Sequence, residues 1–138
     1  MFAVLAQVNW LAVLIAFVVT TALAGVYFAV IIAKPYLVAL GREDAPKTPS
    51  SVVRNVGPIV AGLVVVVTSA ILLRALDVTT IADAVVFGLI VGVGYLAAMT
   101  FQIALNPNFP RPLYYGVLNA PYFVVSSVIS SVILVLVR

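Results

Sequence analysis

Residues 81–105 constrain this chain most, because they form an apolar stretch long enough to cross a lipid bilayer. About 20 apolar residues, each rising about 1.5 Å in a helix, cover the hydrocarbon core of roughly 30 Å. Similar stretches occupy residues 8–33, 56–73 and 113–137. Only 8% of the residues are charged, against about 25% in soluble domains, so the chain cannot cover a water-facing surface. We therefore predict an all-α membrane protein with four transmembrane helices in a compact bundle, forming one domain over residues 1–138.

The residue types present exclude several kinds of chemistry. The chain contains no cysteine and no histidine, which excludes disulfides, thiolate metal sites and imidazole acid–base catalysis. The serines of the last stretch have no base on their own helix, as a serine nucleophile would need; they are Ser126, Ser127, Ser130 and Ser131. A net charge of +3 is too small to favour nucleic-acid binding. We expect no enzyme activity, no cofactor and no metal, and the lipid bilayer as a partner.

One face of the third stretch is suited to contact with other helices. Ala84, Gly88 and Gly92 recur every four residues, so they stack on one side of a helix and allow a neighbouring backbone to come close. The same side is expected to continue in polar and flexible residues at steps of four, three and four, namely Tyr95, Met99, Gln102 and Asn106. A helix facing lipid has no use for such a face, so we predict that it packs inside the bundle.

Three of the predicted helices bring polar groups to similar depths in one half of the membrane. The candidate cluster consists of Thr20, Tyr27, Tyr95, Gln102, Asn119, Tyr122 and Ser126. One interpretation is hydrogen bonding between helices, which contributes about 0.6 kcal/mol for each bond on average. The other is a polar cavity for a small solute, open to the cytoplasm. The large amides of Gln102 and Asn119 keep the second interpretation open, because serine or threonine suffices for most interhelical bonds.

No charged side chain lies near the middle of any predicted span, although proton-coupled and ion-coupled carriers usually need one. The leading hypothesis is therefore a non-catalytic membrane protein that acts through helix association, as an accessory subunit or a small homo-oligomer. The alternative is a small uncoupled transporter or channel. Its pathway would run along Tyr27, Tyr95, Gln102, Asn119 and Tyr122.

Local signals mark the predicted helix ends. Pro35 ends the first helix, because proline disfavours helical geometry in the residue before it. Asn55 is the expected N-cap of the second helix, with Pro58 in its first turn. Thr80 and Asp83 fit a capping box that opens the third helix.

The basic residues predict an orientation in the membrane. The long polar loop over about residues 36–54 and the proline-rich connection before the fourth helix fall on the same side. That side holds Lys34, Arg42, Lys47, Arg54 and Arg111, whereas the other side holds Arg74 and Arg138. Because cytoplasmic loops carry the excess of lysine and arginine, we expect both termini outside the cytoplasm.

Several short strings resemble a bacterial membrane family, domain-of-unknown-function family 1761. They are Asn9-Trp10-Leu11-Ala12 at the start of the first helix, Lys34-Pro35-Tyr36 at its end, and Leu118-Asn119-Ala120-Pro121-Tyr122 in the last helix. Arg111 stands where the family tends to carry a basic residue before that helix. The resemblance covers the whole chain as four helices. It implies a four-helix protein of the bacterial cell membrane and no agreed activity.

Overall fold

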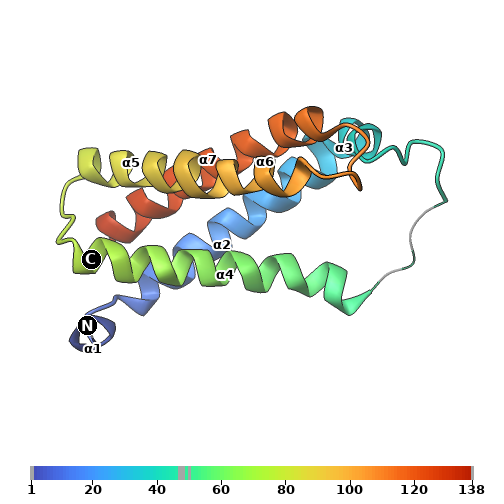
Figure 1. Cartoon of the computed structure of the whole chain (residues 1–138). Coiled ribbons are helices and arrows are strands. Elements are labelled where there is room, and N and C mark those ends of the chain that lie inside the picture. The colour runs from blue at the N-terminus through green and yellow to red at the C-terminus, as the bar shows by residue number, and fades with distance from the viewer. Residues whose placement is uncertain (1, 47–48, 50, 138) are drawn as a thin grey trace.

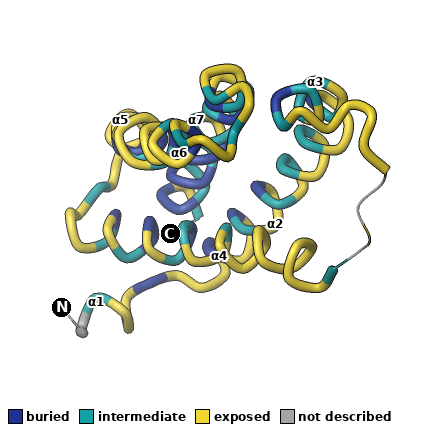
Figure 2. The backbone as a smooth tube through the Cα atoms, turned by 45° about the vertical axis from the view of Figure 1, so that its right-hand side comes forward, coloured by how far each residue is buried: buried dark blue, intermediate teal, exposed yellow. Residues whose placement is uncertain are grey.

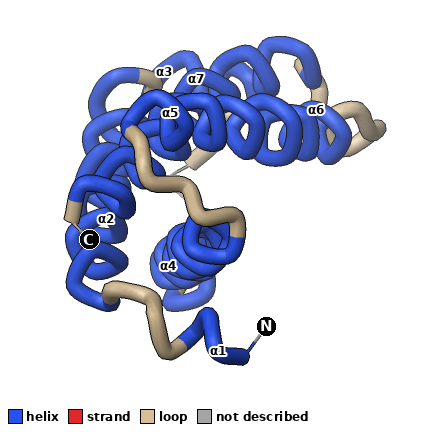
Figure 3. The backbone as a smooth tube through the Cα atoms, turned by 90° about the vertical axis from the view of Figure 1, so that its left-hand side faces the viewer, coloured by secondary structure: helices blue, strands red, loops and turns tan. Residues whose placement is uncertain are grey.

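The computed structural model describes residues 2–46, 49 and 51–137, which form helices and loops but no strand (Figure 3). The helices are α1 (Phe2–Leu5), α2 (Trp10–Val26), the π-helix η1 (Tyr27–Ile31), α3 (Ala33–Ala39), α4 (Val52–Ala75), α5 (Ile81–Leu89), the π-helix η2 (Ile90–Ala97), α6 (Ala98–Ala104) and α7 (Pro112–Leu136).

Four of the helical segments are long and apolar enough to cross a membrane. They span Trp10–Ile31, Val52–Ala75, Ile81–Ala104 and Pro112–Leu136. The first joins α2 to η1, and the third joins α5, η2 and α6 into one continuous helix. The predicted fold class, an all-α protein with four membrane-spanning helices packed together, is confirmed.

The helix ends agree with the sequence signals in part. The Thr80 hydroxyl accepts from the Asp83 N–H at 3.1 Å, so Thr80 caps the helix as predicted, but the Asp83 carboxylate accepts from the Thr80 hydroxyl at 2.6 Å where a full capping box would use the backbone N–H of Thr80. The prediction that Asn55 caps the second helix is wrong, because α4 begins at Val52. Pro58 therefore lies inside α4, one turn later than expected.

A short helix also follows the first span where the sequence suggests only an end. The span stops at Ile31, and α3 begins at Ala33 with Pro35 in its first turn, where the missing N–H costs little. α3 packs against α7. This contact brings Tyr36 beside the start of the last helix, where the Tyr36 and Tyr115 hydroxyls lie 3.4 Å apart.

The spans alternate in direction, so both termini lie at one end of the bundle (Figure 1). At that end Asn9 Nδ2 donates to the Val137 carbonyl. The opposite end carries the long loop after α3 and the connection into α7. These two loops meet through an ion pair in which Arg111 Nη2 lies 3.4 Å from Glu43 Oε1.

α7 is the central helix of the bundle and contacts α2, α3, α4, α5, η2 and α6. The apolar core lies at the end of the bundle that holds the termini, where residues such as Ala12, Ala70 and Leu134 pack together. The buried residues of α4 all fall in its second half, from Val66 onward. Its first half is largely exposed (Figure 2) and borders a cavity that is also lined by α2 and α7.

Candidate functional site

Small residues allow the third span to lie directly on α7. Ala84, Gly88 and Gly92 are all buried there. A methyl group built on Gly88 would lie 2.6 Å from the Val128 Cα, and one on Gly92 would lie 2.8 Å from the Val124 Cα. Backbone cannot move aside as the tip of a side chain can, so glycine at these two positions permits the close approach.

The face that contacts α7 changes register inside η2. The N–H of Ala98 reaches the Val93 carbonyl, five residues back, in the manner of a π-helix. A π turn contains about one residue more than an α turn. The buried side of the helix therefore passes from Gly92 to Ala97 and then to Ala104.

This change of register moves two of the predicted cluster residues to the outside of the bundle. Tyr95 is 70% exposed, and Gln102 is exposed as well. Neither side chain has a hydrogen-bond partner among the described residues. The structure thus does not bring Tyr95 and Gln102 to Asn119 and Tyr122, and the pathway predicted along these residues is not continuous.

The other five predicted cluster residues do lie together, between the first span and α7. They are Thr20, Tyr27, Asn119, Tyr122 and Ser126. Two hydroxyls link the helices: Tyr27 donates to the Leu118 carbonyl at 2.8 Å, and Tyr122 donates to the Thr20 carbonyl at 3.4 Å. Interhelical bonds are therefore present, but they run from side chain to backbone.

The remaining polar groups of the cluster bond within their own helices. Asn119 Nδ2 donates to the Tyr115 carbonyl at 2.7 Å, and the Thr20 hydroxyl donates to the Ala16 carbonyl at 2.8 Å. The Ser126 hydroxyl donates to the carbonyl three residues before it, at 3.2 Å. The interpretation of hydrogen bonding between helices therefore does not extend to the Asn119 amide group, whose Nδ2 bonds within α7.

A serine row on α7 continues the polar side of the helix into the core. Ser127, Ser130 and Ser131 are buried. The hydroxyls of Ser130 and Ser131 both donate to the Ser127 carbonyl, at 3.0 and 2.8 Å. The Ser127 hydroxyl itself is buried without a hydrogen-bond partner. Sequence reasoning assigned these serines to no site, because serine is also ordinary packing surface in a membrane helix.

A cavity of about 670 Å³ lies between α2, the first half of α4, and α7. Its size is that of a site for a small organic molecule. Most of its surface is apolar, and its polar groups are concentrated on α7 and at Thr20 and Thr21. Among the residues that the structure describes, no charged side chain lines it: the lining residues are Thr20, Thr21, Ala24, Gly25, Phe28, Tyr36, Pro58, Ile59, Ala61, Gly62, Val65, Val66, Leu96, Tyr115, Asn119, Tyr122, Phe123, Ser126, Ser127 and Ser130.

Aromatic rings form the end of the cavity nearest α3. The Phe28 ring packs edge-on against Tyr122 at 5.1 Å between centroids and against Tyr36 at 5.8 Å. The Tyr36 and Tyr115 rings lie 5.6 Å apart. Burial, together with the hydrogen bond to Tyr115, raises the pKa of Tyr36 well above its ordinary value, so this phenol stays neutral. No pattern in the sequence predicted that α3 packs against α7 and so places Tyr36 here.

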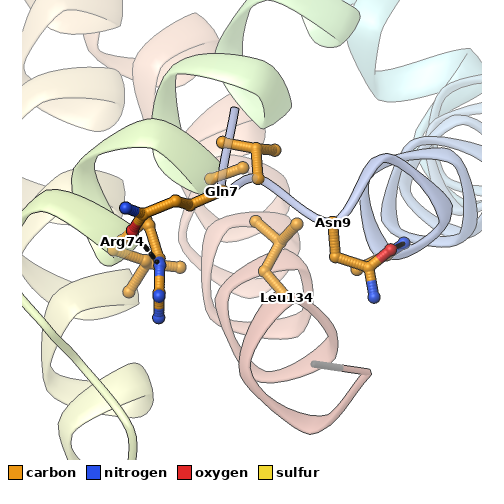
Figure 4. Close-up of a pocket in the computed structure, with 8 residues that line it drawn as sticks. Gln7, Asn9, Arg74 and Leu134 are labelled. Atoms are coloured by element: carbon orange, nitrogen blue, oxygen red, sulfur yellow. Dashed lines mark hydrogen bonds between the residues drawn. The ribbon is translucent and has the colours of Figure 1, made fainter. Parts of the chain in front are cut away.

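A second, smaller pocket of about 240 Å³ lies at the end of the bundle that holds the termini (Figure 4). Arg74 Nε donates to Gln7 Oε1 at 3.1 Å on one side of it, and Asn9 and Leu134 lie on the other. Asn9 also caps α2 by accepting from the Leu11 and Ala12 N–H groups. The polar side chains of this smaller pocket thus bond to one another and to the ends of helices. Among the described residues, no three His, Cys, Asp or Glu side chains lie close enough to hold a metal ion.

Comparison with known proteins places this four-span chain in a family. A family model described as protein of unknown function (DUF1761) matches residues 11–135, from the second residue of α2 to the penultimate residue of α7. The chain belongs to this family. Membership in DUF1761 confirms the resemblance seen in the sequence and brings no activity with it. No curated protein and no solved structure matches the chain.

Proposed function

We propose that this DUF1761 protein is a non-catalytic integral membrane protein that acts through helix association, as a small homo-oligomer or as the accessory subunit of a partner membrane protein. The supporting observation is an unused packing face on the outside of the third span. The absence of charged side chains from the large cavity also supports a non-catalytic role.

The association face consists of Gly94, Tyr95, Ala98, Met99 and Gln102, all of which are exposed. Gly94 and Ala98 are four residues apart, the spacing of small residues at which membrane helices come close. A methyl group built on Gly94 would have nothing within 4 Å, so no helix of this chain uses that space. Another polypeptide could therefore pack here as closely as α7 packs on Gly88 and Gly92.

Tyr95 gives the strongest reason for such a partner. It lies nine residues before the end of α6, about 14 Å into the membrane, and side chains on a helix tilt toward its N-terminus. Its hydroxyl is therefore directed to the middle of the bilayer and away from the nearer headgroups. A polar group in hydrocarbon is stabilised by a hydrogen bond from a neighbouring helix, which a second subunit would supply.

The proposed orientation places both termini outside the cytoplasm of a bacterial cell. Lys34, Arg42, Arg54 and Arg111 belong to the end of the bundle with the long loop, and Arg74 belongs to the other end. Lys47 and Arg138, which the charge count also uses, lie outside the described residues. The excess of basic residues supports a cytoplasmic location for the long loop.

Cysteine cross-linking tests the association directly, because the native chain has no cysteine. Ala98→Cys places one thiol at the centre of the association face. In a twofold dimer the same residue of each copy meets near the axis, so oxidation in membranes should give a covalent dimer. The matched control is Val64→Cys, an exposed position on another span, α4, that is not part of the association face.

A dimer band for Ala98→Cys without one for Val64→Cys supports the homo-oligomer. Adding Gly94→Leu to Ala98→Cys should then weaken that band, since a bulky side chain would fill the space at the contact. Equal bands at both positions would show random collision. If, in addition, no stoichiometric partner co-purifies in mild detergent, the proposal of association is wrong.

A further inference from the structure

The large cavity has a lining suited to an uncharged lipophilic molecule. It is bounded by the first half of α4, none of whose described residues is buried, so this wall of the cavity lies on the lipid-facing side of the bundle. The lining contains no charged side chain, so a charged head group would lose its hydration there without gaining a counter-ion. An ordinary acyl chain would match the apolar wall but would leave Asn119 Oδ1 and the Ser127 hydroxyl without partners.

The side chain of Asn119 indicates which chemical group a molecule in the cavity would carry. Its side chain is 3% exposed and lines the cavity. Because Nδ2 donates to the Tyr115 carbonyl, which can only accept, the orientation of the amide is fixed by chemistry. Asn119 Oδ1 then has no hydrogen-bond partner among the described residues. A carbonyl oxygen only accepts, so the group that it lacks is a donor, such as a hydroxyl.

The surroundings of Asn119 favour a planar ring. Tyr115 and Tyr122, which precede and follow Asn119 on α7, line the same part of the cavity as Phe28 and Tyr36. Aromatic faces and edges pack well against another ring. From Tyr115 to the last lining residue of α7 the cavity extends over 15 residues, or about 22 Å, long enough for a ring with an apolar tail.

We propose that this cavity binds a neutral lipophilic phenol or quinol, a hydroxylated planar ring that carries an apolar chain. The ring lies among Phe28, Tyr36 and Tyr122, and its hydroxyl donates to Asn119 Oδ1. The chain lies along the apolar wall of α4 toward Ser130. This site is distinct from the association face, which lies on the exposed side of the third span, so the two proposals can fail separately.

A pair of matched probes isolates the hydroxyl. Purified protein in detergent is titrated with 4-decylphenol or with 4-decylanisole, whose methoxy group lacks the donor hydrogen. The apparent affinity is read from the rise of the thermal midpoint with ligand concentration. The phenol should give a saturable rise and bind roughly 3- to 10-fold more tightly than the anisole, the factor that one neutral hydrogen bond contributes. In Asn119→Leu the two probes should bind equally.

Glycine variants test whether binding occurs in this cavity. Methyl groups built on Gly25, Gly57 and Gly62 would all meet nothing within 4 Å, but only Gly25 and Gly62 line the cavity. Gly62→Leu, and independently Gly25→Leu, should fill the cavity and abolish the saturable rise. Gly57→Leu, on the same helix as Gly62, should retain it.

Two results would overturn the proposal. Equal affinity of the phenol and the anisole for the native protein would mean that the cavity accepts any apolar chain and does not recognise a hydroxyl. A saturable rise that persists in both Gly25→Leu and Gly62→Leu would place the binding elsewhere. Each variant is first melted without ligand, so a cooperative transition shows that the fold is retained.

Discussion

At the scale of single residues, a tyrosine hydroxyl of the first span bonds to the backbone of α7 beside the proline inside that helix. Pro121 lies within α7 and has no N–H, so the Val117 carbonyl loses its donor in the helix. The adjacent Leu118 carbonyl accepts from the Tyr27 hydroxyl of the first span at 2.8 Å. Tyr27 thus bonds to the carbonyl next to the one that Pro121 frees, and it ties the first span to α7 at this point.

Removing this hydroxyl should therefore weaken the fold. Tyr27→Phe keeps the ring and deletes the bond to the Leu118 carbonyl, at a cost of about 0.5–1.5 kcal/mol. Tyr114→Phe is the matched control, because Tyr114 is exposed and its hydroxyl has no hydrogen-bond partner within the part of the chain that the structure describes. Denaturation in detergent measures both variants. Equal losses would mean that the Tyr27 bond contributes nothing specific.

Replacement by alanine should change the stability of the fold in opposite directions at two glycines. Gly92→Ala places a methyl group 2.8 Å from the Val124 backbone and should cost about 1–3 kcal/mol through overpacking. Gly62→Ala enters open space inside a helix and should stabilise by about 0.5–1 kcal/mol, because alanine loses less chain entropy. Thermal melting of the two variants decides. A loss of stability at Gly62 would show that its surroundings are not open.

At the scale of elements, the sequence predicts the four spans well and the register of one of them poorly. Stretches of about 20 apolar residues are a strong signal, because a bilayer leaves the chain few other structures. The packing side of the third helix was also predictable, because Ala84, Gly88 and Gly92 recur every four residues and so stack on one side of a helix. Beyond Gly92 a period of 3.6 places Tyr95 inward, but η2 shifts the buried face to Ala97. No residue pattern in the sequence predicts the π-helix, so Tyr95 and Gln102 were wrongly expected to face the bundle interior.

Substitutions on either side of that shift test the register. Ala97 is buried against α7, whereas Met99 is exposed. Ala97→Leu should cost about 1–3 kcal/mol by overpacking, and Met99→Ala should change stability by less than about 0.5 kcal/mol, as surface substitutions do. Unfolding in a detergent that keeps the protein monomeric gives both values. The reverse ranking would favour an uninterrupted α-helix with Met99 facing inward.

At the scale of the whole molecule, the packing is uneven along the membrane normal. One half holds the apolar core around Ala70 and Leu134, and the other holds the aromatic rings and the cavity. The sequence predicted polar groups from several helices in that second half, but it could not show that α4 stands away from α7. That separation depends on tertiary packing, because the apolar residues in the first half of α4 suit contact with lipid as well as with another helix.

The two ends of the molecule also differ in charge, and this difference predicts how it lies in the membrane. Basic residues gather beside the loops that meet through Arg111 and Glu43, so that end should face the cytoplasm. Asn108 and Thr79 are exposed at opposite ends and suit single-cysteine labelling in a chain without native cysteine. In intact cells a membrane-impermeant maleimide should label Thr79→Cys and spare Asn108→Cys, which should react only after the membrane is opened. Labelling of Asn108→Cys from outside would reverse the orientation while leaving the fold and the cavity unchanged.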